Sequence, residues 1–216
     1  MDRDGLDWRH VAAWRAWFTW TGLCWQRDET GLVREQARQA CRAAAHACDK
    51  PNEVRRICSD KTISAVVRIA ASDPAIAIRT SELDAYPMLI NTPAGVIDLE
   101  TGEVLDHDRD LLLTQTTNAS PGDGCPRWTR FLDEITNGDA ELQAYLQRLA
   151  GYLLTGATSE QMFAFFHGAG ANGKSVFIQT LAFVLGDYAS TATLDTFMAS
   201  STSKHLTELA GLRGTL

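Results

Sequence analysis

The sequence predicts an α/β protein in two units, an α+β module at 1–118 and the beginning of a parallel-sheet domain at 126–216. One observation is a tryptophan-rich start followed by segments of helical period. Another is a dense cluster of turn residues at 117–127, which marks the boundary. The third is an aromatic run, a glycine-rich loop and an apolar helical segment at 161–185, which is the strand, loop and helix order of a parallel α/β sheet.

Length and composition are those of a folded protein. The chain has 216 residues, of which 45% are hydrophobic and 22% charged, so a buried core can form. The sequence contains no apolar run near the roughly 20 residues that span a bilayer, and its charged start lacks the apolar core of a secretory signal. The five cysteines form no Cys-x-x-Cys pair, which argues against a zinc ribbon or a disulfide framework. We therefore expect a cytoplasmic protein with reduced thiols and no membrane contact.

The first unit is expected to mix helices and hairpins. Residues 8–27 hold five of the six tryptophans, and we predict a helical start followed by a hairpin that turns at Thr21. The Ala/Arg/Gln-rich stretch 31–72 predicts two helices with a break at Pro51. The stretch 86–106 predicts a hairpin of short apolar strands.

The second unit is expected to lead from helices into a parallel sheet. Leucines and Tyr145 recur every three to four residues in 128–155, which predicts two helical pieces separated at Asn137-Gly138. The aromatic run 161–167 predicts a buried parallel strand. A helix from about residue 174 to 185 should follow, with Gly186 as its stop.

Between that strand and that helix lies a full match to Gly-x4-Gly-Lys-[Ser/Thr], the P-loop or Walker A pattern. Small residues let the backbone wrap around a polyphosphate, so that successive N–H groups and the helix N-terminus face the anion. Lys174 would reach the β- and γ-phosphates, and the hydroxyl of Ser175 would bind Mg²⁺. The predicted binding residues for ATP and Mg²⁺ are Gly168, Ala169, Gly170, Ala171, Asn172, Gly173, Lys174 and Ser175.

Hydrolysis needs a second element, an aliphatic strand that ends in Asp or Glu. The stretch 187–216 contains no such pattern, and the one upstream candidate, 95–100, is better interpreted as a surface turn in a hairpin. We therefore identify no catalytic residue and expect the sheet of the P-loop domain to be incomplete within this sequence.

Four segments, taken together in order and spacing, carry a family resemblance: 88–102, 125–132, 145–156 and 168–175. The sequence resembles the phage and plasmid DNA primase-helicases over roughly residues 10–216. In that family a helicase-associated module precedes a superfamily 3 helicase domain of the AAA+ type, related to the poxvirus replicative NTPase. The resemblance assigns 1–118 to the module and 126–216 to the lead-in and first part of the helicase domain.

The resemblance implies the ATP-binding part of a replicative helicase that unwinds DNA as an ATP-driven ring, usually a hexamer, around a single strand or fork. It also implies a Walker B strand, a sensor asparagine and an arginine finger, none of which the sequence shows. Two alternatives stay open. One is a non-catalytic oligomerisation or DNA-loading module whose P-loop is vestigial or completed by another chain. The other, less favoured, is a small P-loop kinase.

Charge is unevenly distributed. The chain has a net charge of −7, yet 31–72 holds eight basic residues against four acidic ones, a net charge of +4. These bases could follow a DNA backbone, although a solvated helix face is the favoured interpretation. The tryptophans of 8–27 could stack on bases, although a role in the core is favoured.

Overall fold

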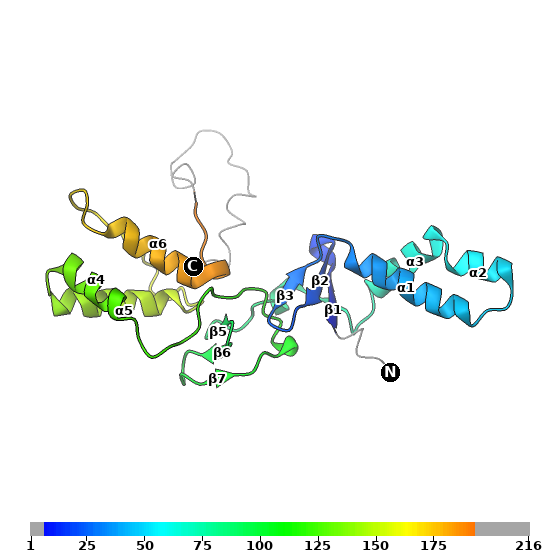
Figure 1. Cartoon of the computed structure of the whole chain (residues 1–216), viewed down its shortest axis with the longest axis horizontal. Helices are drawn as coiled ribbons and strands as arrows, with labels where there is room; N and C mark the ends of the chain where they lie inside the picture. The colour runs from blue at the N-terminus through cyan, green and yellow to red at the C-terminus, as the bar shows by residue number, and fades with distance from the viewer. Residues whose placement is uncertain (1–6, 193–216) are drawn as a thin grey trace. The chain divides into compact units, whose positions relative to one another are not determined.

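A computed structural model describes residues 7–192, which form a mixed α/β structure with two small sheets and six α-helices in this range (Figure 1). Contacts divide these residues into two compact units. One unit is 7–85 with Asp108–Thr114, and the other is Tyr86–His107 with 115–192. These units are defined by contacts between residues, whereas the domains expected at 1–118 and 126–216 are defined by function. The functional domains therefore stay a prediction. Among the described residues, no helix is both long and apolar enough to cross a lipid bilayer.

The first unit contains a four-stranded sheet in the order β3-β2-β1-β4. Its strands are β1 (Trp8–Val11), β2 (Ala16–Trp20), β3 (Trp25–Arg27) and β4 (Ala77–Ile78). The hairpin predicted at Thr21 is confirmed, since Trp20 pairs with Trp25 across the turn. The helical start predicted before it is wrong. Side chains alternate between half-buried and buried along Trp8–Val11, which is the period of a strand.

The core of this sheet is built on Trp25, which is 1% exposed, with Val11, Phe18 and Leu83 around it. The indole Nε1 donates to the carbonyl of Arg109 at 2.8 Å, so the polar atom of this buried ring has a partner. Trp14, by contrast, is 51% exposed. The expectation of core tryptophans therefore holds for Trp25 and fails for Trp14.

Three helices complete the first unit, where the sequence predicted two. They are α1 (Leu32–His46), α2 (Pro51–Ile57) and α3 (Asp60–Ala70). The additional break comes at Ser59, whose hydroxyl accepts from the N–H of Thr62 and caps α3. Residues Ala37 and Cys41 of α1 pack on Ile63 of α3 and form a second small core.

The second unit begins with a three-stranded antiparallel sheet in the order β5-β6-β7. Its strands are β5 (Leu89–Thr92), β6 (Gly95–Asp98) and β7 (Val104–Leu105), which confirms the hairpin predicted over 86–106. The third strand lies against Gly95, where a Cβ atom would stand 2.5 Å from the carbonyl oxygen of Leu105. This close approach requires glycine.

The helices of the second unit are α4 (Pro126–Thr136), α5 (Ala140–Leu153) and α6 (Lys174–Leu185). Asn137, between α4 and α5, is left-handed at φ 51°, which confirms the predicted break. Gly186 ends α6 as predicted. Single turns of 3-10 helix lie at Ala12–Trp14, Thr80–Glu82, Arg109–Leu111 and Gly186–Tyr188.

The predicted parallel strand at 161–167 is wrong for the described structure. This segment pairs with no strand within residues 7–192, and Phe163 and Phe165 are 86% and 78% exposed. An aromatic run indicates a preference for a buried strand, but a strand exists only when neighbouring strands accept and donate its backbone hydrogen bonds. A parallel P-loop sheet is therefore not observed in this part of the chain.

Candidate functional site

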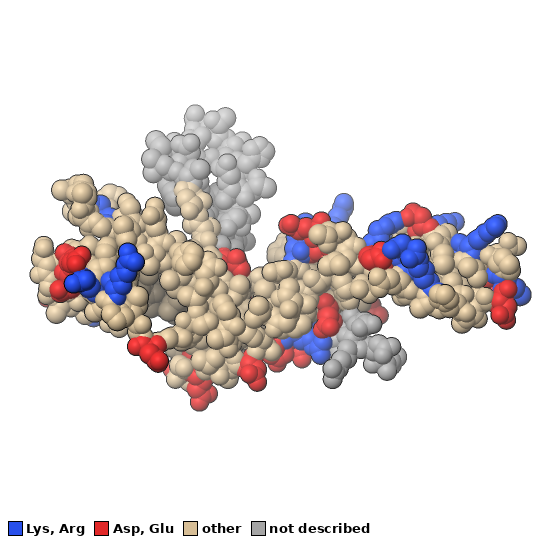
Figure 2. Space-filling model, in the orientation of Figure 1, with Lys and Arg blue, Asp and Glu red and all other residues tan. Residues whose placement is uncertain are grey.

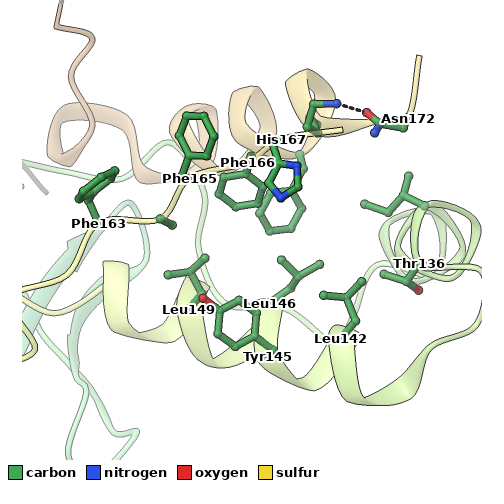
Figure 3. A pocket seen from close by; sticks show the side chains of 14 residues that line it. Thr136, Leu142, Tyr145, Leu146, Leu149, Phe163, Phe165, Phe166, His167 and Asn172 are labelled. Atoms are coloured by element: carbon green, nitrogen blue, oxygen red, sulfur yellow. Dashed lines mark hydrogen bonds between the residues drawn. The ribbon is translucent and has the colours of Figure 1, made fainter. Parts of the chain in front are cut away.

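The glycine-rich loop leads directly into α6 and folds around the first side chain of that helix. The Nζ atom of Lys174 donates to the carbonyl oxygens of Gly168 at 3.2 Å and Ala169 at 3.0 Å. It also donates to Oδ1 of Asn172 at 2.5 Å, the contact drawn in Figure 3. The structure thus brings four of the predicted binding residues together around one ammonium group.

Two glycines of this loop have backbone conformations or neighbours that other residues would not tolerate. Gly168 has a φ of +147°, and a Cβ atom there would lie 2.7 Å from Nδ2 of Asn172. Gly173 has a φ of +80°, and its Cβ would press on Ile135 and on Phe131 of α4. Glycine at both motif positions is therefore required by geometry.

The backbone N–H groups at the start of α6 are available to a ligand. Among the described residues, the N–H groups of Ala169 to Ser175 have no hydrogen-bond acceptor, and no side chain caps the helix. The helix dipole adds a partial positive charge at this end, so the cation of Lys174 is unfavourable there without an anion nearby. Exposed N–H groups and a lysine at a helix N-terminus form an anion-binding arrangement.

An aromatic cluster fixes the start of α6 against α4. The ring of Phe177 stacks on Trp128 at 5.6 Å between centroids and meets Phe166 at 5.7 Å. Trp128 also stacks on Phe131 at 5.2 Å. The sequence predicts helices and a strand for these residues, but it gives no sign that they share one cluster, because only tertiary contacts define it.

The other end of α6 is held by the loop that follows β7. Asn118 donates from its backbone N–H to Val184 and from Nδ2 to the carbonyl of Phe183, at 3.1 and 2.9 Å. The N–H of Asp187 donates to the carbonyl of Thr116 at 3.0 Å. The sequence showed Asn118 only as one of several turn residues, so its role as a helix cap could not be predicted.

A cavity of about 400 Å³ adjoins the loop (Figure 3). The α5 side chains Leu142, Leu146 and Leu149 face the segment that carries Phe166 and His167. Asn172 and Lys174 of the loop contribute polar atoms to one part of the cavity wall. The walls are thus mainly apolar, and none of the described lining residues is acidic.

Ser175, the predicted Mg²⁺ ligand, has an exposed side chain at the second position of α6. Within residues 7–192 no group of three or more His, Cys, Asp or Glu side chains is arranged to hold a metal ion. The stretch 193–216, part of the region where the sequence shows no Walker B pattern, lies outside the described residues. The assignments of Ser175 to the metal and of 168–175 to ATP stay predictions.

Comparison with known families now places the chain. Residues 1–137 match a family model described as D5 N terminal like, which is more than half of the sequence. The chain belongs to this family. The D5 N-terminal-like domain is the N-terminal domain of phage and viral primase-helicases, so the resemblance drawn from the sequence motifs is confirmed. The glycine-rich loop lies beyond the matched residues.

Two curated proteins are similar to this D5 N-terminal-like chain. A "Putative helicase L207/L206" of Acanthamoeba polyphaga mimivirus is 31% identical over 140 residues, which are 61% of this chain and 14% of that protein. An "Uncharacterized mitochondrial protein ymf21" of Marchantia polymorpha is 39% identical over 57 residues, which are 26% of this chain and 32% of that protein. The chain thus spans about a third or less of the length of either relative.

Proposed function

We propose that the chain binds the phosphates of ATP, with Mg²⁺, at Gly168–Ser175 as the nucleotide-binding part of a replicative DNA helicase. The observation that carries this proposal is the start of α6, where a lysine and a series of backbone N–H groups without acceptors converge. Membership of the D5 N-terminal-like family supports the helicase context.

Four residues of the loop have distinct roles in this proposal. Lys174 exchanges its contacts with Gly168, Ala169 and Asn172 for the phosphate oxygens. Ser175 supplies a hydroxyl to Mg²⁺, which in turn neutralises phosphate charge. Gly168 and Gly173 keep the backbone free of Cβ atoms, so that the loop can approach the anion.

The exchange is favourable because the partners of Lys174 change from neutral oxygens to anionic ones. The bonds of Lys174 to neutral oxygens are already charge-assisted, at about 1.5–3 kcal/mol each, and phosphate oxygens add the attraction between two opposite full charges. The carbonyl oxygens of Gly168 and Ala169 are left to water, since this part of the loop is exposed. The exchange should therefore favour the bound state through the attraction between the Lys174 ammonium and the phosphate charge.

The same proposal predicts binding without turnover by residues 1–216. A carboxylate that polarises the attacking water is needed for hydrolysis. No acidic side chain lines the cavity beside Lys174 among the described residues, and the sequence offers none in a Walker B pattern. In the complete helicase we propose that such groups come from further sequence or from neighbouring subunits of a ring, often a hexamer, that encircles single-stranded or forked DNA during cytoplasmic replication.

Calorimetric titration of the full chain with Mg-ATP tests the proposal. Lys174→Ala should weaken binding by about 10- to 100-fold, the equivalent of one charge-assisted hydrogen bond or more. Lys50→Ala, in the other compact unit, removes the same charge and should leave the affinity unchanged. Equal affinity of the wild type and Lys174→Ala would contradict the proposal, as would Mg²⁺-independent binding.

A second candidate function is a non-catalytic oligomerisation or DNA-loading module with a vestigial or trans-completed P-loop. The observation that favours it is that Lys174 is already engaged by its own loop and by Asn172, with no acidic group among the described lining residues. Light scattering coupled to size exclusion separates the two. Assembly that needs ATP supports the motor, whereas a ring that forms without nucleotide supports the module.

A further inference from the structure

The segment from α1 to α3, residues 32–70, carries most of the basic residues of the first unit, and three of these have local acidic partners. Ion pairs join Arg34 to Asp60, Arg38 to Glu35, and Lys50 to Glu53. The bonds from Arg38 and Gln39 hold the pKa of Glu35 down to about 2, so this carboxylate is ionised at neutral pH. The acidic residues near these helices are thus largely committed to partners.

Five other cations on the same helices have no ion pair or hydrogen bond to another described side chain. All five side chains are exposed: Arg42, Arg55, Arg56, Lys61 and Arg68. Of the four acidic residues in 31–72, only Asp49 has no ion pair among the described residues. Figure 2 shows Lys and Arg gathered over these helices among fewer acidic side chains.

Helical spacing places many of these cations on one face. Arg34, Arg38 and Arg42 are four residues apart on α1, and Lys61 and Arg68 are seven apart on α3, so each set forms a stripe. Arg34 of α1 reaches across to Ser64 and Asp60 of α3, which shows that the two stripes adjoin. Together they define a basic face, the surface of Arg34, Arg38, Arg42, Lys61 and Arg68.

An apolar groove lies on the other side of the same helices. It has a volume of about 420 Å³ and is lined by Ala37 and Ala40 of α1, Val67 and Ala70 of α3, and Trp17 of the sheet. At 100° per residue, the centre of the groove positions lies about 180° from the centre of the basic stripe on α1 and about 160° from it on α3. The basic face and the apolar groove are therefore separate surfaces. A protein partner bound to the basic face would make no apolar contact in the groove.

We propose that the basic face of α1 and α3, extended by Arg55 and Arg56 of α2, binds the phosphate backbone of DNA without sequence preference. The choice of DNA as the polyanion rests on the proposed helicase function. Phosphate contacts made by Lys and Arg release condensed counterions and carry no sequence information. The guanidinium groups of Arg42, Arg55, Arg56 and Arg68 suit this role because they lose no ion pair with a described residue when they bind, whereas Arg34 and Arg38 already have acidic partners.

Fluorescence anisotropy with a labelled single-stranded oligonucleotide, without ATP, tests the surface. One phosphate contact from each of the five cations without an ion pair among the described residues predicts a slope of about −3.5 for log K against log salt, and thus about a 100-fold loss of affinity from 50 to 200 mM salt. The triple variant Arg42→Ala, Lys61→Ala and Arg68→Ala should reduce the slope by about 2 and weaken binding about 100-fold at 0.1 M salt. These positions are exposed and helical, so alanine should not disturb the fold.

A matched control has the same change in charge within the second unit. It combines Arg127→Ala, Arg130→Ala and Arg148→Ala, which are also exposed helical positions. This control should keep wild-type affinity and slope. Equal weakening of both triple variants would overturn the proposal, because net charge alone would then account for binding.

Two further outcomes separate this inference from the proposed function. A chain that binds Mg-ATP through Lys174 but not DNA would overturn the basic face and leave the nucleotide site intact. A chain that binds DNA through the basic face but does not bind ATP would overturn the nucleotide site and leave the basic face intact. Competition by polyglutamate as strong as by unlabelled DNA would also overturn the proposal, in favour of an acidic protein partner.

Discussion

Helices α1 and α6 both begin after a glycine of the same backbone conformation, but an acidic side chain lies at the start of α1 and a basic one at the start of α6. Each follows a left-handed glycine, Gly31 at φ 79° and Gly173 at φ 80°. At α1 the carboxylate of Asp28 accepts from four backbone N–H groups, those of residues 30–33, at 2.8 to 3.0 Å. At α6 no side chain caps the described helix start, and Lys174 stands at its first position.

The two helix starts have the same physical requirement. A helix N-terminus exposes N–H groups and a partial positive charge, which an anion stabilises. The first unit supplies that anion from its own sequence, and its helix is a structural element. For the second unit we propose that the anion is the phosphate of a nucleotide, which would accept from the N–H groups that have no acceptor among the described residues.

The largest difference in stability between the two helix starts should appear when their glycines are replaced. Gly173→Ala should lower the free energy of unfolding by about 2–4 kcal/mol, because left-handed strain adds to overpacking against Ile135 and Phe131. Gly31→Ala should cost about 1–2 kcal/mol, since its Cβ would meet open space and only the strain remains. Urea denaturation of both variants measures the difference, and equal losses would show that close packing on α4 plays no part.

Removal of the Asp28 carboxylate should have a somewhat smaller effect on the free energy of unfolding. Asp28→Ala should lower the free energy of unfolding by about 1–2 kcal/mol through loss of the cap on α1. Asp28→Asn keeps an acceptor oxygen and should lose less. Denaturant titration checks both, and an Asn variant as unstable as the Ala variant would show that the charge is essential.

The pH dependence of the Asp28 contribution follows from its pKa. Burial raises this pKa, but the four backbone N–H groups outweigh burial and hold it below the ordinary value of 3.8. The folded state therefore binds the proton less readily than the unfolded state, so the contribution is complete above pH 3.8 and disappears as pH falls through the lower, folded pKa. The stability difference between wild type and Asp28→Asn should be constant from neutral pH down to about pH 5 and shrink in stronger acid.

The smallest effect on stability is expected at the lysine of the second helix start. Lys174→Ala removes three contacts of an exposed ammonium group but also removes a cation from a helix N-terminus, and these changes oppose each other. The free energy of unfolding should change by less than about 1 kcal/mol. Thermal unfolding without nucleotide checks this expectation. A large loss of stability would make Lys174 a structural residue and weaken the nucleotide proposal.

Several elements could be predicted from the sequence because their causes are local. The break at Asn137, the hairpin turn at Thr21 and the stop at Gly186 each depend on the conformational preference of one or two residues. The site loop belongs to the same class, since its glycines and Lys174 are fixed by a short motif. In the structure Lys174 donates to Gly168, Ala169 and Asn172, and the predicted role of these residues in phosphate binding stays a prediction.

Errors in the prediction arose where neighbours in space decide the structure. The aromatic run 161–167 has the composition of a buried strand, but among the described residues no strand pairs with it. The segment Trp8–Val11 was expected to be helical and is a strand, because β2 and β4 pair with it on both sides. Such pairing cannot be deduced from the segment alone, since a strand completes its hydrogen bonds on other segments.

The sequence by itself determined the family, the Gly-x4-Gly-Lys-Ser motif and the excess of bases in 31–72, because each depends on residue types and short spacings. Tertiary structure decided which bases lack acidic partners and that Asn118 caps the end of α6. It also decided that Phe177 holds the start of that helix on Trp128. These are relations between distant segments, and they arise only when packing brings the segments within contact distance.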